Sequence, residues 1–451
     1  MMELNSNKHT SSKIYQEIIR IMSTSNPREG CTYQAFINMP DKQMMYQCLK
    51  VRSVDINRDY DNHLADEISV VVTVLPGTWT DIILPQLGNL EMILIRDVEG
   101  FGINRVVSTY RAYCKTPKDF RKDAPHLQGV STETINRMDV VEIEFQLIPK
   151  LIEKLLPIQA GTIFNNCTMK DALSGMLMRE TLLIEGLDDA DKLQGVDIVE
   201  PDNDNTYTSI PIPHATKLIN LPNYMQKESF GVYQQGIGHY IQNAVWYVYP
   251  KFAIKREDEN RRYLNIFVSY RDFMRHADNT YRTEGNDVSI IGSIDGETTE
   301  DQHGKQLTQG NGVRVVNPQV QDTTESLEVK DNKAYAKRSN NVSEFITNPS
   351  KSNNDFAPLA KHNQANVNIY EQVAKTQLTL GNVVSVIWQN SAPDLLKPGM
   401  IVRIHYIEND MDKMIEGVLM KCHHFIQHAS NHMTSNYYTS TSGLFIYVKD
   451  R

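Results

Sequence analysis

The stretch "DLLKPGMIVRIHYI", Asp394 to Ile407, reads as a turn that leads into a strand. Pro398 fixes φ and Gly399 permits a positive φ, so the pair makes a tight entrance to a strand over Met400 to Ile407. A similar outline occurs near the other end of the chain in "DIILPQLGNLEMILI", Asp81 to Ile95. A device used twice, each time before alternating apolar residues, predicts two related β units in one polypeptide.

Length and composition bound the class of protein. The chain has 451 residues, of which 40% are hydrophobic and 22% charged, which is typical of a folded chain with about two to four domains. The net charge of −9 argues against nonspecific binding to duplex DNA, because such binding needs an excess of Lys and Arg.

The cysteines give no sign of a disulfide framework or a zinc ribbon, because no two of them have CxxC spacing. They are Cys31, Cys48, Cys114, Cys167 and Cys422. The first ten residues lack a basic region followed by an apolar run, and no apolar run approaches eighteen residues. We therefore expect neither an export signal nor a membrane anchor.

The first half of the chain begins with a helix and continues as strands. The periodicity of "SSKIYQEIIRIM", after a Ser pair that can cap it, predicts a docking helix within an N-terminal helix and arm, residues 1–29. The sequence predicts a compact all-β unit over residues 30–155, either a barrel or a sandwich, because β-branched runs alternate with turns. The clearest alternation is that of Val141, Ile143, Phe145 and Leu147 with polar residues.

After the first β unit the spacing of apolar residues changes from that of strands to that of a helix. Helical spacing predicts a helical connector over residues 156–215. In its helix Thr168 is the N-cap and Asp171 occupies the third position. The residues expected to face inward are Ala172, Met176, Leu177 and Leu183. The closely spaced prolines of "IPIPHATKLINLP" predict an extended crossing that is neither a helix nor a central strand.

The second half predicts a β unit interrupted by a polar segment. Residues 216–291 form an aromatic-rich β region contributing to the second barrel, with "VWYVYPKF" and "RRYLNIFVSY" as a predicted hairpin. Residues 292–366 are too polar to bury a core of their own, which predicts a polar insertion or extended arm. The sequence predicts that residues 367–451 form the C-terminal strands that complete the second barrel. The fold class is mainly β with α elements.

Motifs for chemistry are sparse. The glycines of "GVYQQGIGHY" match no nucleotide-binding spacing, so we expect a turn beside aromatic packing. In "CHHFIQHASNH", Cys422, His424 and His428 share one face of a strand and His432 lies beyond it. A straight strand spaces such side chains about 7 Å apart, whereas metal ligands must converge. We therefore expect no metal and no cofactor, and no GxSxG or HExxH motif indicates an active site.

The block "YMQKESFGVYQQGIGHYIQNAVWYVYPKF" is the most distinctive part of the chain. Tyrosine and tryptophan are favoured where an apolar body packs and a polar tip meets water or a partner. The block fits either a hairpin core with a tyrosine rim or a subunit contact. The candidate interface anchors are Tyr233, Tyr240, Trp246, Tyr247 and Tyr249.

This block, with "GTIFNNCTMKDALSGML" before it and "IWQNSAPDLLKPGMIVRIHYI" after it, resembles the central hub proteins of contractile-tailed phage baseplates. The resemblance lies in the order of short features over most of the chain. The long insertion and the extended N-terminus depart from the family pattern. Two tail-tube-like β-barrels in one chain would be expected of such a hub.

The resemblance also implies a function. Hubs of this family are homotrimers in which six barrels join a sixfold tail tube to a threefold central spike, and they form part of the channel for genome ejection. The expected partners are therefore a second and third copy of the chain, a tail tube or tube-initiator protein, the spike and the baseplate wedge proteins, with DNA passing only transiently. The resemblance implies a virion tail component, assembled in the host cytoplasm, without catalytic residues.

Two other classes stay open on the sequence alone. A tail-associated cell-wall hydrolase would need a carboxylate pair, and such residues can lie far apart in sequence. A carbohydrate-binding receptor protein would use exposed aromatic residues to stack on sugars.

Overall fold

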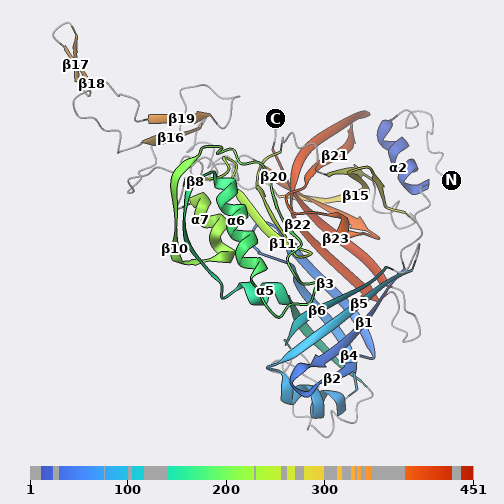
Figure 1. Cartoon of the computed structure of the whole chain (residues 1–451). Coiled ribbons are helices and arrows are strands. Elements are labelled where there is room, and N and C mark those ends of the chain that lie inside the picture. The colour runs from blue at the N-terminus through green and yellow to red at the C-terminus, as the bar shows by residue number, and fades with distance from the viewer. Residues whose placement is uncertain are drawn as a thin grey trace.

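The computed structural model describes residues 12–23, 30–75, 77–99, 104–115, 140–227, 230–254, 262–269, 279–298, 381–428 and 438–449, and four short strands between 312 and 346. Within these residues the chain is mainly β with few helices, which confirms the predicted fold class. Strands from both ends of the chain pair into one large sheet, and a smaller mixed unit lies beside it (Figure 1). No helix among the described residues is long and apolar enough to cross a membrane.

The strands of the N-terminal unit pair in a ring. They are β1 (Gly30–Met39), β2 (Met44–Gln47), β3 (Lys50–Asp59), β4 (Glu67–Val74), β5 (Leu90–Glu99), β6 (Asn104–Cys114) and β7 (Val141–Pro149). Their order is β2-β1-β5-β6-β7-β4-β3. β2 and β3 are two halves of one bent strand, because the Cys48 N–H donates to Ala35 and the next N–H, of Leu49, donates to Thr73. The path of pairings therefore returns to β1.

The C-terminal unit shows the same closure. Its strands are β13 (Tyr263–Val268), β15 (Asp287–Thr298), β20 (Asn382–Gln389), β21 (Ile401–Glu408), β22 (Met411–His428) and β23 (Tyr438–Val448), with β14 (Tyr281–Glu284) against β15. The pairings run β22-β21-β13-β15-β20-β23, and β23 pairs again with β22. Consecutive strands β21, β22 and β23 pair in turn, and β20 pairs with β23.

The two units share one strand order. The bent strand β2–β3 is counted here as one strand. Strands that pair in the N-terminal unit then have counterparts that pair in the C-terminal unit. The equivalent strands are β1 and β13, the bent strand and β15, β4 and β20, β5 and β21, β6 and β22, and β7 and β23. The one difference is direction: β1 is antiparallel to both neighbours, whereas β13 is parallel to both. The second strand of each unit carries a register shift, at Arg52 and at Asp295.

The two similar stretches of sequence precede corresponding strands. A helical turn over Thr78–Gln86 leads into β5, and a turn over Pro393–Leu395 leads into β21. Gly399 has φ of +66°, as its place in the turn predicts. The common order therefore supports the prediction of two related β units, and their superposition stays a prediction.

Alternation along the strands places the cores. The apolar residues Val141, Ile143, Phe145 and Leu147 of β7 are all buried, as predicted, in the core of the N-terminal unit. The C-terminal unit shares a second core with the mixed unit. The N-terminal helix α2 (Lys13–Ser23) packs Ile14, Ile18 and Ile21 on β13 and β15. The Lys13 N–H and the Ser12 hydroxyl both donate to the Asp412 carboxylate, at 3.0 and 2.6 Å, and the serine cap stays a prediction.

The mixed unit contains α5 (Lys150–Leu155), β8 (Gln159–Cys167), α6 (Met169–Leu182), β9 (Gly195–Ile198), β10 (Tyr207–Lys217), α7 (Leu221–Lys227), β11 (Ile237–Gln242) and β12 (Val245–Pro250). β8 pairs with β10, and β12 lies between β11 and β9. The predicted hairpin of "VWYVYPKF" with "RRYLNIFVSY" is therefore wrong, because β12 stays in this unit while β13 joins the large sheet. The proline-rich crossing is extended, as predicted, but it forms β10.

The polar segment 292–366 starts later than predicted, because β15 runs to Thr298. Within it β16 (Gly312–Val316) pairs with β19 (Val342–Ile346), and β17 (Leu327–Lys330) pairs with β18 (Lys333–Ala336). The role of this segment as a polar insertion or extended arm stays a prediction. The rest of the segment lies outside the described residues.

Candidate assembly site at the junction of the two units

The two units meet through backbone hydrogen bonding. Residues 53–59 of β3 pair antiparallel with residues 421–427 of β22. This ladder joins six strands into a sheet that spans both units in the order β7-β4-β3-β22-β23-β20, which we call the shared sheet. Neither unit contributes a loop to this contact, so the relative position of the units is fixed by main-chain geometry.

The shared sheet has one apolar and one polar face. On β22, Cys422, His424 and Ile426 are buried, whereas His423 and Phe425 between them are exposed. Successive side chains of a strand point to opposite faces. The buried face covers both cores, and the other face is available to solvent or to a channel.

The polar face carries side chains of both signs. His423 Nε2 lies 2.7 Å from an Asp55 carboxylate oxygen, across the junction. Lys115 Nζ lies 2.9 Å from the Glu144 carboxylate, and its hydrogen bond lowers the pKa of that carboxyl. Lys421 and Phe445 line the same shallow depression. A face of mixed sign offers no run of cations that would hold a phosphate backbone.

A buried ion network fastens the junction from within. The Arg58 side chain is 3% exposed; its Nε lies 3.1 Å from Asp66, and its Nη1 donates to the Pro393 carbonyl at 2.7 Å. Asp394, the second residue of the turn before β21, lies between Arg58 and Arg96. Burial alone would raise the pKa of Asp394, but the two guanidinium groups lower it on balance. The network connects β3 and β5 of one unit to the turn of the other.

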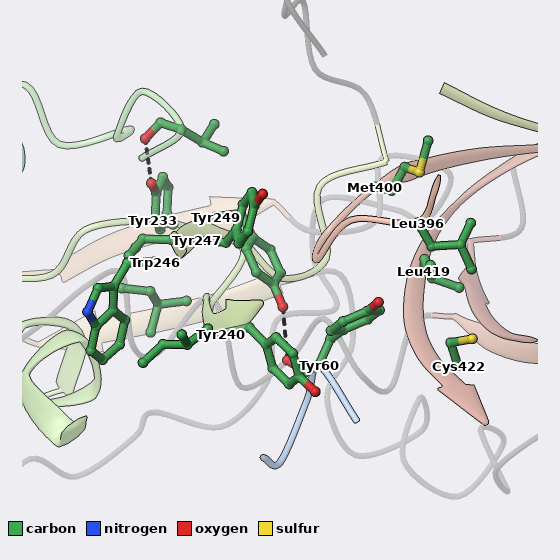
Figure 2. Close-up of a cluster of buried hydrophobic side chains, with 14 of the residues drawn as sticks. Tyr60, Tyr233, Tyr240, Trp246, Tyr247, Tyr249, Leu396, Met400, Leu419 and Cys422 are labelled. Carbon is green, nitrogen blue, oxygen red and sulfur yellow. Dashed lines mark hydrogen bonds between the residues drawn. The ribbon is translucent and has the colours of Figure 1, made fainter. Parts of the chain in front are cut away.

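The five candidate interface anchors lie inside the molecule. Tyr233, Tyr240, Trp246, Tyr247 and Tyr249 are each at most 9% exposed and belong to one buried cluster (Figure 2). Their positions give no support to a direct role in subunit contact, because a buried side chain has little surface left for a partner. The structure favours their interpretation as core residues, and these five rings leave little surface on which a sugar could stack.

The polar tips of this cluster bind the mixed unit to the junction. The Tyr240 hydroxyl donates to Asp66 at 2.9 Å, and the Tyr249 hydroxyl donates to the Tyr60 carbonyl at 2.9 Å, as Figure 2 shows for the second bond. A Cβ at Gly399 would lie 2.2 Å from a ring atom of Tyr249. The glycine of the turn is therefore required by close packing as well as by its φ, a constraint that the sequence did not indicate.

The histidine and cysteine candidates are also structural. His424 Nδ1 lies 2.8 Å from the Ser442 hydroxyl, and burial lowers the pKa of His424 to about 3. Burial raises the pKa of the neighbouring Cys422 thiol to about 11. Among the described residues no three His, Cys, Asp or Glu side chains are placed to hold a metal ion, and His432 lies outside that range.

No protein-family model matches the chain, and no curated protein matches its sequence. Among solved structures it is similar to the tail protein from Neisseria meningitidis MC58, with 13% identity, 92% of this chain and 96% of that chain covered, and a TM-score of 0.43. It is similar to the 43 kDa tail protein of prophage MuSo2 from Shewanella oneidensis, with 8% identity, 92% and 98% covered, and a TM-score of 0.48.

A third structural neighbour comes from a secretion system. This is the E. coli c3393 protein, a component of the type VI secretion system with structural similarity to the T4 bacteriophage tail proteins gp27 and gp5. The identity is 9%, the alignment covers 89% of this chain and 74% of that chain, and the TM-score is 0.39. Two of these three structural neighbours are tail proteins, and the third has structural similarity to tail proteins.

Proposed function

We propose that this chain is a structural, non-enzymatic protein of a phage tail: the homotrimeric hub of the baseplate. The observation that carries the proposal is the repeat of one strand order in two units joined edge to edge by β3 and β22. The domain boundaries predicted above, with two tube-like barrels as their main parts, belong to the same proposal.

The repeat explains how three chains can meet sixfold and threefold partners. If the edge contact inside one chain recurs between chains, three chains form a ring of six similar units. Contacts of this head-to-tail kind close only at a fixed rotation. One end of such a ring can match a sixfold tail tube or tube-initiator protein, and the differences between the two units leave threefold symmetry for the spike.

The polar face of the shared sheet suits the wall of a channel. In a closed ring one face of the shared sheet is turned toward the axis. Because the apolar face is buried against the two cores, the polar face is the one that would line the channel. A lining that pairs Asp55 with His423 and Glu144 with Lys115 presents no excess of positive charge to passing DNA. DNA would therefore contact this wall only during ejection. The wedge proteins of the baseplate would bind the outside of the ring, in a virion component assembled in the host cytoplasm.

Electron cryomicroscopy of tails from the phage or prophage that encodes this chain tests the proposal. We expect three copies of the chain around the tail axis, between the tube and the spike, with the shared sheet facing the channel. Purified tails that lack the chain, or that carry it away from the axis, would contradict the proposal.

A further inference from the structure

The outer side of α6 carries exposed apolar side chains. Met178 is 41% exposed, Leu182 is 61% exposed, and Leu183, directly after the helix, is 68% exposed. Met178 and Leu182 are four residues apart, so they lie on the same side of the helix. A Cβ added at Gly175, one turn before Met178, would meet nothing within 4 Å. This side of α6 is therefore open, whereas the opposite side packs in the core.

The segment that follows α6 holds most of the net charge of the chain. Residues 185–204 contain eight acidic residues and one lysine, a formal charge of −7, whereas the whole chain has −9. The rest of the chain thus carries only −2, so the negative field of the molecule originates mainly in this acidic segment.

The acidic segment lies along α6 from its end to its beginning. It starts directly after the helix, its strand β9 packs on the helix, and Glu200 forms an ion pair with Lys170 in the first helical turn. The lysine of the segment, Lys192, is also paired, because its Nζ lies 2.7 Å from the Asp189 carboxylate. The exposed apolar side chains and the acidic residues therefore belong to one surface.

The charge of this surface selects the kind of partner. A negative surface repels the phosphates of DNA and of anionic lipids. No three His, Cys, Asp or Glu side chains in the described ranges are placed to hold a metal ion. Apolar side chains beside a charged rim are instead the arrangement of a protein interface, and a rim of one sign is complemented by a partner of the opposite sign.

We infer that Met178, Leu182 and Leu183, together with the acidic segment, form a docking surface for another tail protein, which we call the α6 surface. The partner presents lysine and arginine side chains around an apolar contact. Two copies of this surface cannot bind each other, because both are negative. The inference rests on the proposed function for the class of the partner, and it adds the face of the hub that is bound and the charge of what binds it.

Electron cryomicroscopy of tails from the phage or prophage that encodes this chain identifies the occupant. We expect a protein other than this chain on the α6 surface, with apolar side chains on Leu182 and basic side chains beside the acidic segment. An α6 surface that faces solvent, or that is covered by another copy of this chain, overturns the inference. The same map tests the proposed function separately, by the number of copies of the chain and their distance from the tail axis.

Binding of the purified occupant to the purified chain gives the quantitative test. Leu182→Arg puts a cation at the apolar centre and keeps a residue type that favours helices, so binding should weaken by about tenfold or more. Ile19→Arg is the matched control, because Ile19 is 60% exposed on α2, which lies far from α6 in Figure 1. A Leu182→Arg variant that binds as tightly as the wild type overturns the inference.

The salt dependence of the same binding tests the charge of the partner. Wild-type affinity should fall between about 0.05 and 0.3 M salt, because salt screens exposed charges. The double variant Glu185→Gln with Asp204→Asn removes two exposed negative charges, so its affinity should fall less steeply over that range. Wild-type affinity that does not change with salt overturns the inference, because the partner would then not be recognised by its charge.

Discussion

His423 and His424 are neighbours in sequence with opposite surroundings. His423 faces the polar side of the shared sheet beside Asp55, whereas His424 is 3% exposed and hydrogen-bonds to Ser391 and Ser442. Burial is the main cause that lowers the pKa of His424 to about 3 from an ordinary value of 6.5. One step along the strand therefore separates an exposed histidine from a buried one whose charged form is disfavoured by burial.

This difference predicts a pH dependence of stability. Below about pH 6.5 the unfolded chain binds a proton at His424 that the native chain does not, so stability falls toward pH 3 by up to about 1.4 kcal/mol per pH unit. Between about pH 7 and pH 5 the wild type should lose about 2 kcal/mol more than His424→Gln in urea unfolding. A His424→Gln variant as sensitive to acid as the wild type would refute this account.

Helix α6 shows how far local sequence can predict an element. Thr168 caps the helix by accepting from the Asp171 N–H at 3.2 Å, and Asp171 accepts from the Thr168 N–H in return, as predicted. Ala172 and Leu177 are buried, as expected. Leu183 is not: it lies beyond the last helical turn and is 68% exposed. Capping and period depend on near neighbours, whereas the burial of a helix end depends on what packs there.

The cap gives a prediction at the scale of the element. Thr168→Ala leaves the Asp171 N–H without its side-chain acceptor, so the free energy of unfolding should fall by about 1 kcal/mol. Thr168→Ser keeps an oxygen in the same place and should remain close to the wild type. Thermal unfolding of the three proteins checks this, and an unchanged midpoint for Thr168→Ala would contradict it.

Partners distant in sequence limited the other element predictions. The alternation of β7 identified its buried face, but no local pattern shows that β12 pairs with β9 or that β13 pairs with β21. At the start of α2 the Lys13 N–H donates to Asp412, almost four hundred residues away. The sequence shows the cluster of aromatic residues, but its place in the core depends on distant segments, such as the turn whose Gly399 packs against Tyr249.

Across the whole molecule, Arg58 joins the two units. Arg58→Ala should lower the free energy of unfolding by about 3–5 kcal/mol, because it removes the buried positive charge that pairs with the Asp66 and Asp394 carboxylates. Arg52→Ala is the control: its partner, Glu142, is more than half exposed, so the loss should be at most about 1 kcal/mol. Urea unfolding of the isolated chain measures both, and equal losses would show that the network does not hold the junction.

The short similarity between Asp81–Ile95 and Asp394–Ile407 indicated the repeat, and the common strand order supports it. The contact between the units was not predictable in the same way, because no local pattern shows that β3 pairs with β22, more than three hundred residues away.

The central claim is that two equivalent units per chain build a ring from three chains. Native mass spectrometry of the purified wild-type chain tests it most directly. A chain of 51.6 kDa should give a dominant species of three times that mass, about 155 kDa, without an open series of larger oligomers. A chain that stays at 51.6 kDa at all concentrations, alone and with tube or spike protein, would contradict it.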